Sequence, residues 1–437
     1  MCPLRYAKYY KLDLNLCYAY GNDISDLAML NCVGNPRLVN PSSSMLSAFS
    51  VNKVLLIKMR IKMKMKMKIL ITLLSGLITT SVSAYDSLSD SGFYHLQKKS
   101  GGHFGIYFLR RAIFSEYSPQ YPLWSDGADK KRWIYLPRRK KIDTSNPNSW
   151  VFPRGTKLWK EFSFIETGKK RKIETRLLEK ISDTDWIAET YVWNEDQTVA
   201  TLAPEEGIKE HYLLANGKYY DIPSKHDCSY CHSKGGIDSG PKKTPVLGFS
   251  ALQLSDDRDP NAIHGSELKP GMITLSELQR LKKTTKILQV MPRIQNVASA
   301  PLQRSVFGYL HANCGHCHNE SGFAEFTTTL NFNHDATANY IQQNGTYKTA
   351  IGKSISDYLT STGSPEKVIN PGAAENSALI YRMTEEQEEY TFEIPPWHHS
   401  AGFSLTAGVK MPFVGTNVVD SKAVDIIKKY INNLSGD

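Results

Sequence analysis

The sequence predicts an α+β protein in which an N-terminal antiparallel all-β domain precedes two mainly α segments. Three observations predict this class. Residues 157–222 contain three successive hairpin patterns, two Cys-x-x-Cys-His motifs follow at 228–232 and 314–318, and an amphipathic helical stripe ends the chain. With 437 residues, 41% of them hydrophobic, the chain is long enough for two or three domains with separate cores.

The formal net charge of +10 has a local source. Residues 1–84 hold 11 of the 53 basic residues and 3 of the 43 acidic ones, so the rest of the chain carries 42 basic against 40 acidic residues. The body of the chain therefore lacks the basic surplus that binding to a phosphate backbone requires. We expect no nucleic-acid partner.

Residues 59–84 have the pattern of a secretory signal peptide. Basic residues from Lys58 to Lys68 alternate with apolar ones, an apolar run of about 11 residues follows at 69–79, and Val82-Ser83-Ala84 offers small residues for cleavage. The run is too short to cross a hydrocarbon core of about 30 Å. A membrane anchor or a buried helix is the alternative. We expect export to the periplasm and no stable membrane span after cleavage.

The upstream segment, residues 1–58, is unexpected because a signal peptide acts from a free N-terminus. About residues 20–58, with Asp23 and Asp26, resemble a C-terminal fragment of haloacid dehalogenase-like phosphatases, in which such an acidic pair helps to hold Mg²⁺. The resemblance covers only about 40 residues and lacks the family's nucleophilic Asp-x-Asp segment and its core sheet, so we expect no phosphatase activity. We interpret 1–58 as a spurious or degenerate upstream segment, with the functional start near Met59 or Met63. A genuine leader is the alternative.

The β-rich domain is predicted for residues 85–224. Six of the seven tryptophans lie between Trp124 and Trp193, where strand-like residues flank short polar turns. The predicted hairpins span 157–181, 186–203 and 211–222, the last around the hairpin dipeptide Asn216-Gly217. Three successive hairpins predict an antiparallel meander.

The cysteines carry the strongest functional signal. Without residues 1–84 the chain retains Cys228, Cys231, Cys314 and Cys317, all within the two Cys-x-x-Cys-His motifs. This motif is the signature of c-type haem attachment. The two thiols can bond the two vinyl groups of one porphyrin, and the next imidazole ligates the iron, so His232 and His318 are the candidate proximal ligands. Disulfides within each motif, or a zinc site shared by both motifs, are the alternatives.

Met411 is the candidate distal ligand of the second haem. Met411-Pro412 precedes a predicted C-terminal helix capped by Asp420 or Ser421, which resembles the distal loop of small class I cytochromes c. The apolar stripe of that helix is Ala423, Ile426, Ile427, Tyr430, Ile431 and Leu434. A second stripe, which predicts the helix before Cys314, is Leu302, Val306, Phe307 and Leu310. Met383 is interpreted as a core residue.

About residues 90–437 resemble a little-characterised family of exported di-haem cytochromes c. The resemblance rests on the segments 121–132, which reads Tyr-Pro-Leu-Trp-Ser-Asp-Gly-Ala-Asp-Lys-Lys-Arg, 248–265 and 270–275. It implies two covalently bound haems c and two cytochrome c-like haem-binding segments, 225–300 and 301–437. It also favours Met272 as the distal ligand of the first haem. The alternatives at that position are His264, an open or water-ligated iron, Met291, His226 and His211.

The function that follows is one-electron transfer between a redox protein donor and an acceptor, with no catalytic residue assigned. A di-haem peroxidase-like oxidoreductase with one open haem is the first alternative. In a second alternative the β domain binds a partner or ligand and the cytochrome is its electron outlet. The basic runs 138–141 and 169–172 could attract an acidic redox partner, but we interpret them as solvated turns. His398 and His399 could bind a further metal or act as acid and base, and we interpret them as loop residues.

Overall fold

The computed structural model describes residues 18–21, 35–39, 55–57, 85–93, 113–232, 246–326, 328–355, 365–384, 389–393, 404–408 and 410–435. The chain divides into two compact units. The first comprises Met1–Ser83 and Phe392–Leu405, and the second comprises Ala84–Thr391 and Thr406–Asp437. The predicted signal peptide at 59–84, the acidic pair Asp23 and Asp26, and the pair His398 and His399 lie outside the described residues.

The described part of the first unit includes three short parallel strands. They are β1 (Tyr18–Gly21), β2 (Asn35–Val39) and β3 (Leu55–Ile57), in the order β1-β2-β3. Two further strands, β12 (Glu389–Glu393) and β13 (Ser404–Gly408), pair with each other where the chain passes between the units.

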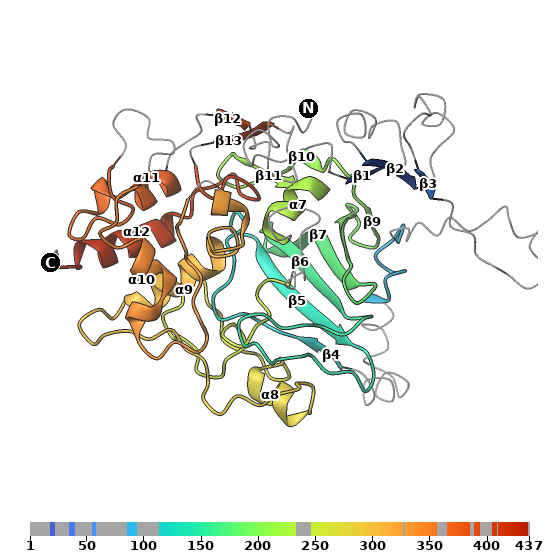
Figure 1. Ribbon diagram of the computed structural model, residues 1–437, viewed down its shortest axis with the longest axis horizontal. Helices are drawn as coiled ribbons and strands as arrows, with labels where there is room; N and C mark the ends of the chain where they lie inside the picture. Colours follow the sequence, from blue (N-terminus) through green and yellow to red (C-terminus); the bar gives the residue numbers. More distant parts are fainter. Residues whose placement is uncertain are drawn as a thin grey trace, which may run out of the picture. The chain divides into compact units, whose positions relative to one another are not determined.

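A six-stranded antiparallel sheet dominates the second unit (Figure 1). Its strands follow one another in sequence order: β4 (Ile113–Glu116), β5 (Asp129–Leu136), β6 (Lys157–Glu166), β7 (Lys169–Lys180), β8 (Trp186–Trp193) and β9 (Ala200–Leu202). A separate two-stranded hairpin follows, formed by β10 (Ile208–Leu213) and β11 (Tyr219–Ile222). The three predicted hairpins are present, the first two within the six-stranded antiparallel meander and the third as a separate two-stranded sheet. With the helices described below, the chain has mixed α+β structure.

The six-stranded sheet is covered on both faces. On one face Trp133 lies opposite Trp159, which in turn lies opposite Leu177, and all three side chains are buried. Phe93, from the segment 85–93, closes this face with its ring centroid 4.9 Å from that of Trp133. Burial of both faces explains why β6 has buried residues at successive positions instead of a strict alternation.

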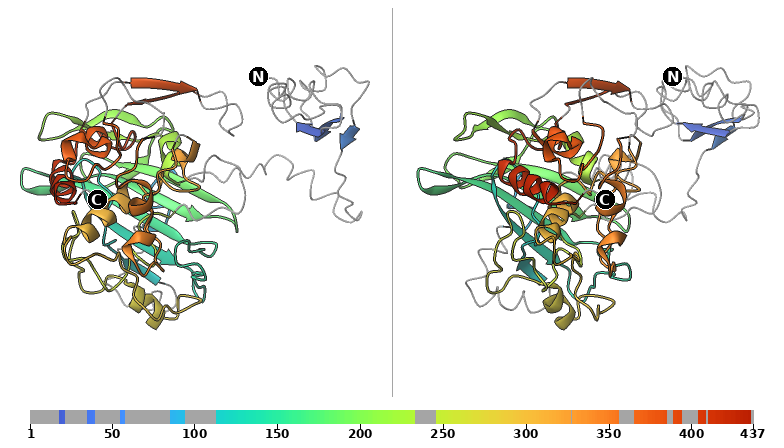
Figure 2. Two further views of the ribbon diagram at one scale, coloured as in Figure 1. Left: turned by 60° about the vertical axis from the view of Figure 1, so that its left-hand side comes forward. Right: turned by 90° about the vertical axis from the view of Figure 1, so that its left-hand side faces the viewer.

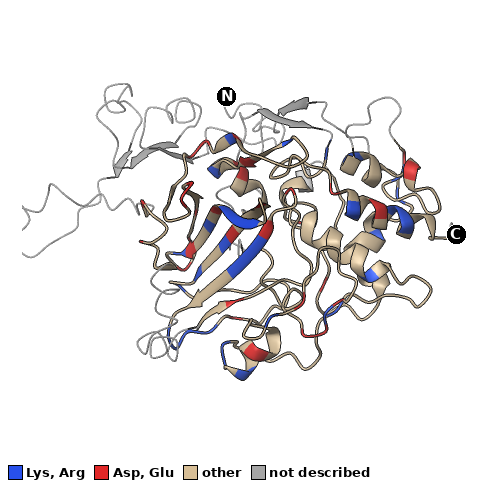
Figure 3. Cartoon of the chain, turned by 180° about the vertical axis from the view of Figure 1, so that it is seen from behind, with Lys and Arg blue, Asp and Glu red and all other residues tan. Residues whose placement is uncertain are grey.

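The second basic run lies where the hairpin pattern predicts it. Lys169 begins β7 directly after the turn at Thr167 and Gly168, both of which have positive φ angles. Lys170 pairs with Asp129 at 2.8 Å and Arg171 with Glu166 at 3.1 Å. The first run, 138–141, is exposed in a turn after β5. Figure 3 shows further Lys and Arg positions side by side on neighbouring strands of the sheet.

The helices of the second unit gather on one side of this sheet, as the rotated views in Figure 2 also show. They are α7 (Lys225–His232), α8 (Leu275–Arg280), α9 (Gln303–Asn313), α10 (Gly345–Thr349), α11 (Ala378–Thr384) and α12 (Ser421–Asn432), with the 3-10 turns η3 (Phe323–Phe326), η4 (Ile341–Gln343) and η5 (Ala374–Asn376). Within the described residues, no helix has the length and apolarity that a bilayer crossing demands.

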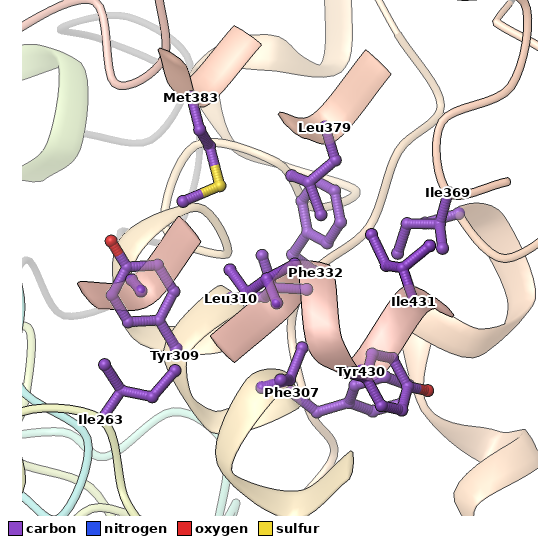
Figure 4. Close-up of a cluster of buried hydrophobic side chains, with 14 of the residues drawn as sticks. Ile263, Phe307, Tyr309, Leu310, Phe332, Ile369, Leu379, Met383, Tyr430 and Ile431 are labelled. Carbon is purple, nitrogen blue, oxygen red and sulfur yellow. The ribbon is translucent and has the colours of Figure 1, made fainter. Parts of the chain in front are cut away.

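The helical core forms where α9 crosses α12. Phe307 meets Tyr430 edge to face with centroids 5.9 Å apart, and the two predicted apolar stripes are buried here. Asp420 caps α12 by accepting a hydrogen bond from the backbone N–H of Ala423 at 3.1 Å, as predicted. Figure 4 shows Met383 reaching from α11 into the same cluster, above Tyr309 and Leu310. Met383 is 7% exposed, which agrees with its interpretation as a core residue.

The segment that joins β4 to β5 connects the sheet to the helices. The ring of Tyr121 lies so close to Gly308 of α9 that any β-carbon there would overlap it. The Trp124 backbone N–H donates to the Oδ1 atom of Asn313 at 2.6 Å, and its indole N–H donates to the carbonyl of Val418 at 3.0 Å. The domain boundaries predicted after residues 224 and 300 therefore fall inside one compact unit.

Gly308→Ala tests this junction. Alanine has a better helix propensity than glycine by about 1 kcal/mol, so an unhindered substitution would stabilise α9. Because the new methyl group must displace Tyr121, we expect a net loss of about 1–3 kcal/mol in the free energy of unfolding. Urea unfolding measures it, and a variant more stable than the parent would contradict the contact.

Candidate functional site

The first Cys-x-x-Cys-His motif forms the body of the short helix α7. The helix starts with a reciprocal cap, because the Asp227 carboxylate accepts hydrogen bonds from the backbone N–H and the hydroxyl of Ser224 at 2.9 and 2.8 Å. Lys225 pairs with Glu189 of β8 at 3.1 Å, which holds the helix against the sheet. Cys228, Cys231 and His232 therefore sit on an element anchored to the β structure.

The second motif begins at the C-cap of α9. Cys314 is the capping residue, and its carbonyl accepts hydrogen bonds from the backbone N–H groups of Cys317 at 3.1 Å and His318 at 2.8 Å. A side chain at Gly315 would collide with the carbonyl of His311 and the side chain of Asn333. The motif is thus a tight turn that continues a helix fixed in the hydrophobic core.

The two motifs meet. The ligand atoms of Cys231, His316 and Cys317 all lie within 4.8 Å of one another. The Sγ atom of Cys317 also lies 3.5 Å from the carbonyl oxygen of Tyr230. All four cysteines of the motifs are free thiols. Two segments that are more than 80 positions apart in sequence therefore form one cluster of sulfur and nitrogen ligands.

The cluster is electrostatically coupled. A hydrogen bond from Cys317 and the nearby imidazole of His316 hold the pKa of Cys231 well below its usual value, although burial opposes this. The same hydrogen bond, together with burial, raises the pKa of Cys317. Burial disfavours the charged form of His316, but the Cys231 sulfur outweighs burial and raises the His316 pKa. The arrangement favours a thiolate beside a thiol and an imidazolium.

The loop of Met411 packs against the same region. Phe413 lies with its ring centroid 5.3 Å from that of Tyr230, the residue inside the first motif, and 5.9 Å from that of Phe323. The backbone N–H of Met411 donates to the carbonyl of Arg382 at 2.6 Å. The structure thus brings the Met411 loop beside the first motif and beside η3, the turn that follows the second motif.

His318 has the properties of an imidazole that lacks a partner. Burial lowers its pKa to about 4, so the ring is neutral at pH 7, the form that ligates metals. Its Nδ1 atom is buried without a hydrogen-bond partner among the described residues. The ring of Phe332 holds it edge to face at 5.5 Å. Burial also raises the pKa of the neighbouring Cys314 thiol to about 12.

Met272 is not brought to the first motif. It lies beside α8 and β4, where the next residue, Ile273, donates its backbone N–H to the Glu116 carbonyl at 2.8 Å. Figure 1 shows α7 and α8 at opposite ends of the sheet.

The other candidate distal ligands of the first haem occupy different parts of the structure. His264 stacks on Trp124 and its Nε2 atom lies 2.8 Å from the Asp420 carboxylate. Met291 packs on the core near α8, and His211 lies in β10. The Nε2 atom of His226 lies 2.9 Å from the Tyr230 hydroxyl.

Sequence reasoning missed His316 and Tyr230, the inner residues of the two motifs. The motif pattern treats these positions as variable, so it gave no reason to select them. A histidine between two cysteines is a signal in itself, because imidazole and thiolate are the ligands of zinc and related metals.

Comparisons of the chain with protein-family models, with curated proteins and with solved structures found no match.

A buried histidine supports the turn of the second motif from behind. His334 donates its backbone N–H to the Nδ1 atom of His311 at 3.2 Å. Its own ring accepts a hydrogen bond from Asn344 at 2.6 Å and donates to the carbonyl of Arg293 at 3.2 Å, which requires the neutral ring. Burial lowers the pKa of His334 to about 4.

This geometry predicts an acid-sensitive fold. The unfolded chain protonates His334 near its ordinary pKa of 6.5 while the folded chain resists until about 4, so stability falls as pH drops between these values. The loss attributable to this residue is on the order of 3 kcal/mol. Urea unfolding of parent and His334→Gln from pH 7.5 to 4 measures it. We expect a flatter pH profile for the variant, and equal slopes would contradict the assignment.

Proposed function

We propose that the chain is an exported, periplasmic di-haem c-type cytochrome that transfers single electrons between a redox protein donor and an acceptor. The observation that carries the proposal is the meeting of the two Cys-x-x-Cys-His motifs in one compact unit. Two haems held at adjacent attachment sites would be close enough to exchange electrons directly. The resemblance to exported di-haem cytochromes favours the same function.

The residues that would hold the first haem are Cys228, Cys231 and His232. Cys314, Cys317 and His318 would hold the second, with Met411 as its distal ligand. Each thiol would add across one vinyl group, with its hydrogen going to the neighbouring carbon, so attachment would consume no oxidant or reductant. When bound, the iron supplies a reversible one-electron couple. The protein contributes the axial ligands, exclusion of water and the local charge.

The donor set fits this group. His318 is neutral at pH 7, and its Nδ1 atom has no hydrogen-bond partner among the described residues. A neutral imidazole is the form that ligates iron. The thiols of both motifs are free. The helix α9, which leads into the second motif, is fixed by its contact with α12 through Phe307 and Tyr430. These observations support Cys314, Cys317 and His318 as an attachment site of fixed geometry.

The placement of Met272 favours a second candidate function. Neither Met272 nor His264 is positioned at α7, and His264 is already engaged by Asp420. A first haem without a protein ligand on its distal side would leave its iron open to small molecules. The second candidate is therefore a di-haem peroxidase-like oxidoreductase.

The Cys231, His316 and Cys317 cluster favours a different alternative. Two cysteine sulfurs and one imidazole within 4.8 Å are a usual partial donor set for zinc. Such a site would consume one thiol from each motif and exclude complete attachment of either haem. The two occupancies are thus mutually exclusive and can be distinguished by composition.

Composition is the first test. We expect a chain that starts near Met59, produced in a host with haem-maturation machinery, to carry two covalent haems. The matched variants Cys228→Ala and Cys314→Ala should each lower the haem-to-protein ratio, because each removes one thioether bond. Haem staining of a denaturing gel and a pyridine haemochrome assay measure this. An uncoloured protein with one equivalent of zinc would establish the metal site instead.

Met411→His tests the distal ligand of the second haem. Imidazole favours ferric iron more than a thioether does, so the second haem should remain six-coordinate while its midpoint potential falls. A band near 695 nm in the oxidised parent, which marks His/Met ligation, should disappear. The core methionine variant Met383→Leu is the control and should leave both properties unchanged. If Met383→Leu removes the band and Met411→His keeps it, the ligand assignment is wrong.

A further inference from the structure

Two segments that are far apart in sequence are joined beside α8. The backbone N–H of Ile142 donates to the carbonyl of Lys283 at 2.8 Å, and the backbone N–H of Thr285 donates to the carbonyl of Ile142 at 3.0 Å. Ile142 and Thr284 form a parallel bridge, and both residues are buried. The turn after β5 is therefore fixed against the loop after α8.

Side-chain hydrogen bonds extend this junction. The Thr144 backbone N–H donates to the hydroxyl of Thr285 at 2.9 Å, and the Lys286 backbone N–H donates to the hydroxyl of Thr144 at 3.0 Å. The Thr285 hydroxyl in turn donates to the Asp143 carboxylate at 2.9 Å. The backbone of Asp143 pairs with that of Val151 at 2.8 and 2.9 Å. The residues that leave this junction toward solvent therefore have a fixed arrangement.

The junction gathers basic residues from both segments. Four lie at 138–141, where the sequence alone indicates a solvated turn, and four more lie between Arg280 and Lys286. Arg280 pairs with Glu277 at 2.6 Å, and Lys283 is half-buried, which lowers its pKa. The remaining cations are exposed, and we refer to them as the basic surface: Arg138, Arg139, Lys140, Lys141, Lys282 and Lys286.

The carboxylates of this region leave most of the charge uncompensated. Glu277 is engaged by Arg280, and Asp143 is held by Thr285. Within the described residues, no ion pair is formed by the following members of the basic surface: Arg139, Lys140, Lys141, Lys282 and Lys286. Because the chain after residue 84 carries 42 basic against 40 acidic residues, this surplus is a local feature.

Exposed aliphatic side chains lie among these cations. Val290 is 80% exposed and Ile287 is 64% exposed, in the loop that follows α8. Leu281 and Val151 are also exposed, the second where the chain pairs with Asp143. Single exposed apolar residues are ordinary, but a group of them around one cluster of cations marks an interaction surface.

The composition of this region favours a lipid bilayer over a protein partner. Protein interfaces are enriched in aromatic residues and depleted of lysine, whereas four of the six exposed cations here are lysines and the exposed apolar residues are aliphatic. A protein that lies on an anionic bilayer combines Lys and Arg for the headgroups with apolar side chains that enter the acyl boundary. Figure 3 shows Lys and Arg positions around α8, at the lower end of the second unit in that view.

We propose that the basic surface binds the anionic headgroups of a lipid bilayer, with Ile287 and Val290 inserted between them. The protein then lies on the membrane without crossing it. The inference does not need bound haem and goes beyond electron transfer, because it assigns the protein a second binding partner. The first motif lies at the opposite end of the sheet from α8, so it stays accessible to a redox partner.

Vesicle binding of the exported chain tests the proposal. The chain should co-sediment with vesicles of phosphatidylglycerol and phosphatidylcholine, more weakly with phosphatidylcholine alone, and less as salt is raised. Lys282→Gln with Lys286→Gln should weaken binding at least about tenfold, because each lysine near an anionic surface strengthens it about fivefold. Lys169→Gln with Lys422→Gln removes the same charge from exposed positions of β7 and α12 and should bind as the parent does.

Two exposed valines separate a bilayer from a protein partner. Val290→Ser removes the most exposed aliphatic side chain and should weaken binding to the phosphatidylglycerol vesicles severalfold. Val199→Ser, at a position that is 44% exposed before β9, is the matched control and should not. If Val290→Ser binds as the parent does, insertion is overturned, and with it the choice of a bilayer.

Each remaining outcome is also decisive. Equal losses in the two pairs of lysine variants would show that net charge alone governs binding, which overturns the proposal. Binding to soluble polyglutamate without binding to vesicles would assign the basic surface to an acidic protein partner instead. Should Lys282→Gln with Lys286→Gln fail to fold, Lys140→Gln with Lys141→Gln replaces it in the same measurement. Because no step uses haem, these results leave the proposed electron transfer untouched.

Discussion

The contact between Tyr121 and Gly308 is the constraint on which the second unit depends. It allows the segment between β4 and β5 to lie against α9 without an intervening side chain. From there Trp124 bonds Asn313 and Val418, and the Asp126 carboxylate accepts from the backbone N–H groups of Asn417 and Val418 at 2.8 Å. One short segment therefore holds the sheet, the helix before the second motif and the loop after Met411 in fixed relation. The sheet also packs on α8, where Ile134 and Leu158 share a buried cluster with Leu278.

This docking of the sheet and the helices brings the two Cys-x-x-Cys-His motifs together. The first motif is carried by a helix anchored to the sheet, and the second by a helix fixed in the helical core. Their meeting at Cys231, His316 and Cys317 is thus a consequence of how sheet and helices dock. The cluster is compatible with adjacent haem attachment sites and with a zinc site, and the two exclude each other because they use the same thiols.

The sheet contributes charge as well as support. Arg132, Lys160 and Arg176 stand in one row on a covered face, where Arg176 pairs with Glu174 and burial lowers the pKa values of Arg132 and Lys160.

The sequence by itself determined the local features. Turn dipeptides and strand-like residues specify the hairpins, and the apolar stripes specify α9 and α12, because each depends on a few neighbouring positions. The spacing of Cys228, Cys231 and His232 likewise predicts a haem attachment motif from neighbouring positions alone. Tertiary structure decided the rest. A β-bulge between Phe162 and Ser163 shifts the register of β6 and β7, so that Arg176 instead of its neighbour Thr175 faces Lys160. The meeting of His316 with Cys231 and the location of Met272 beside α8 likewise depend on packing between elements far apart in the chain, which no local pattern encodes.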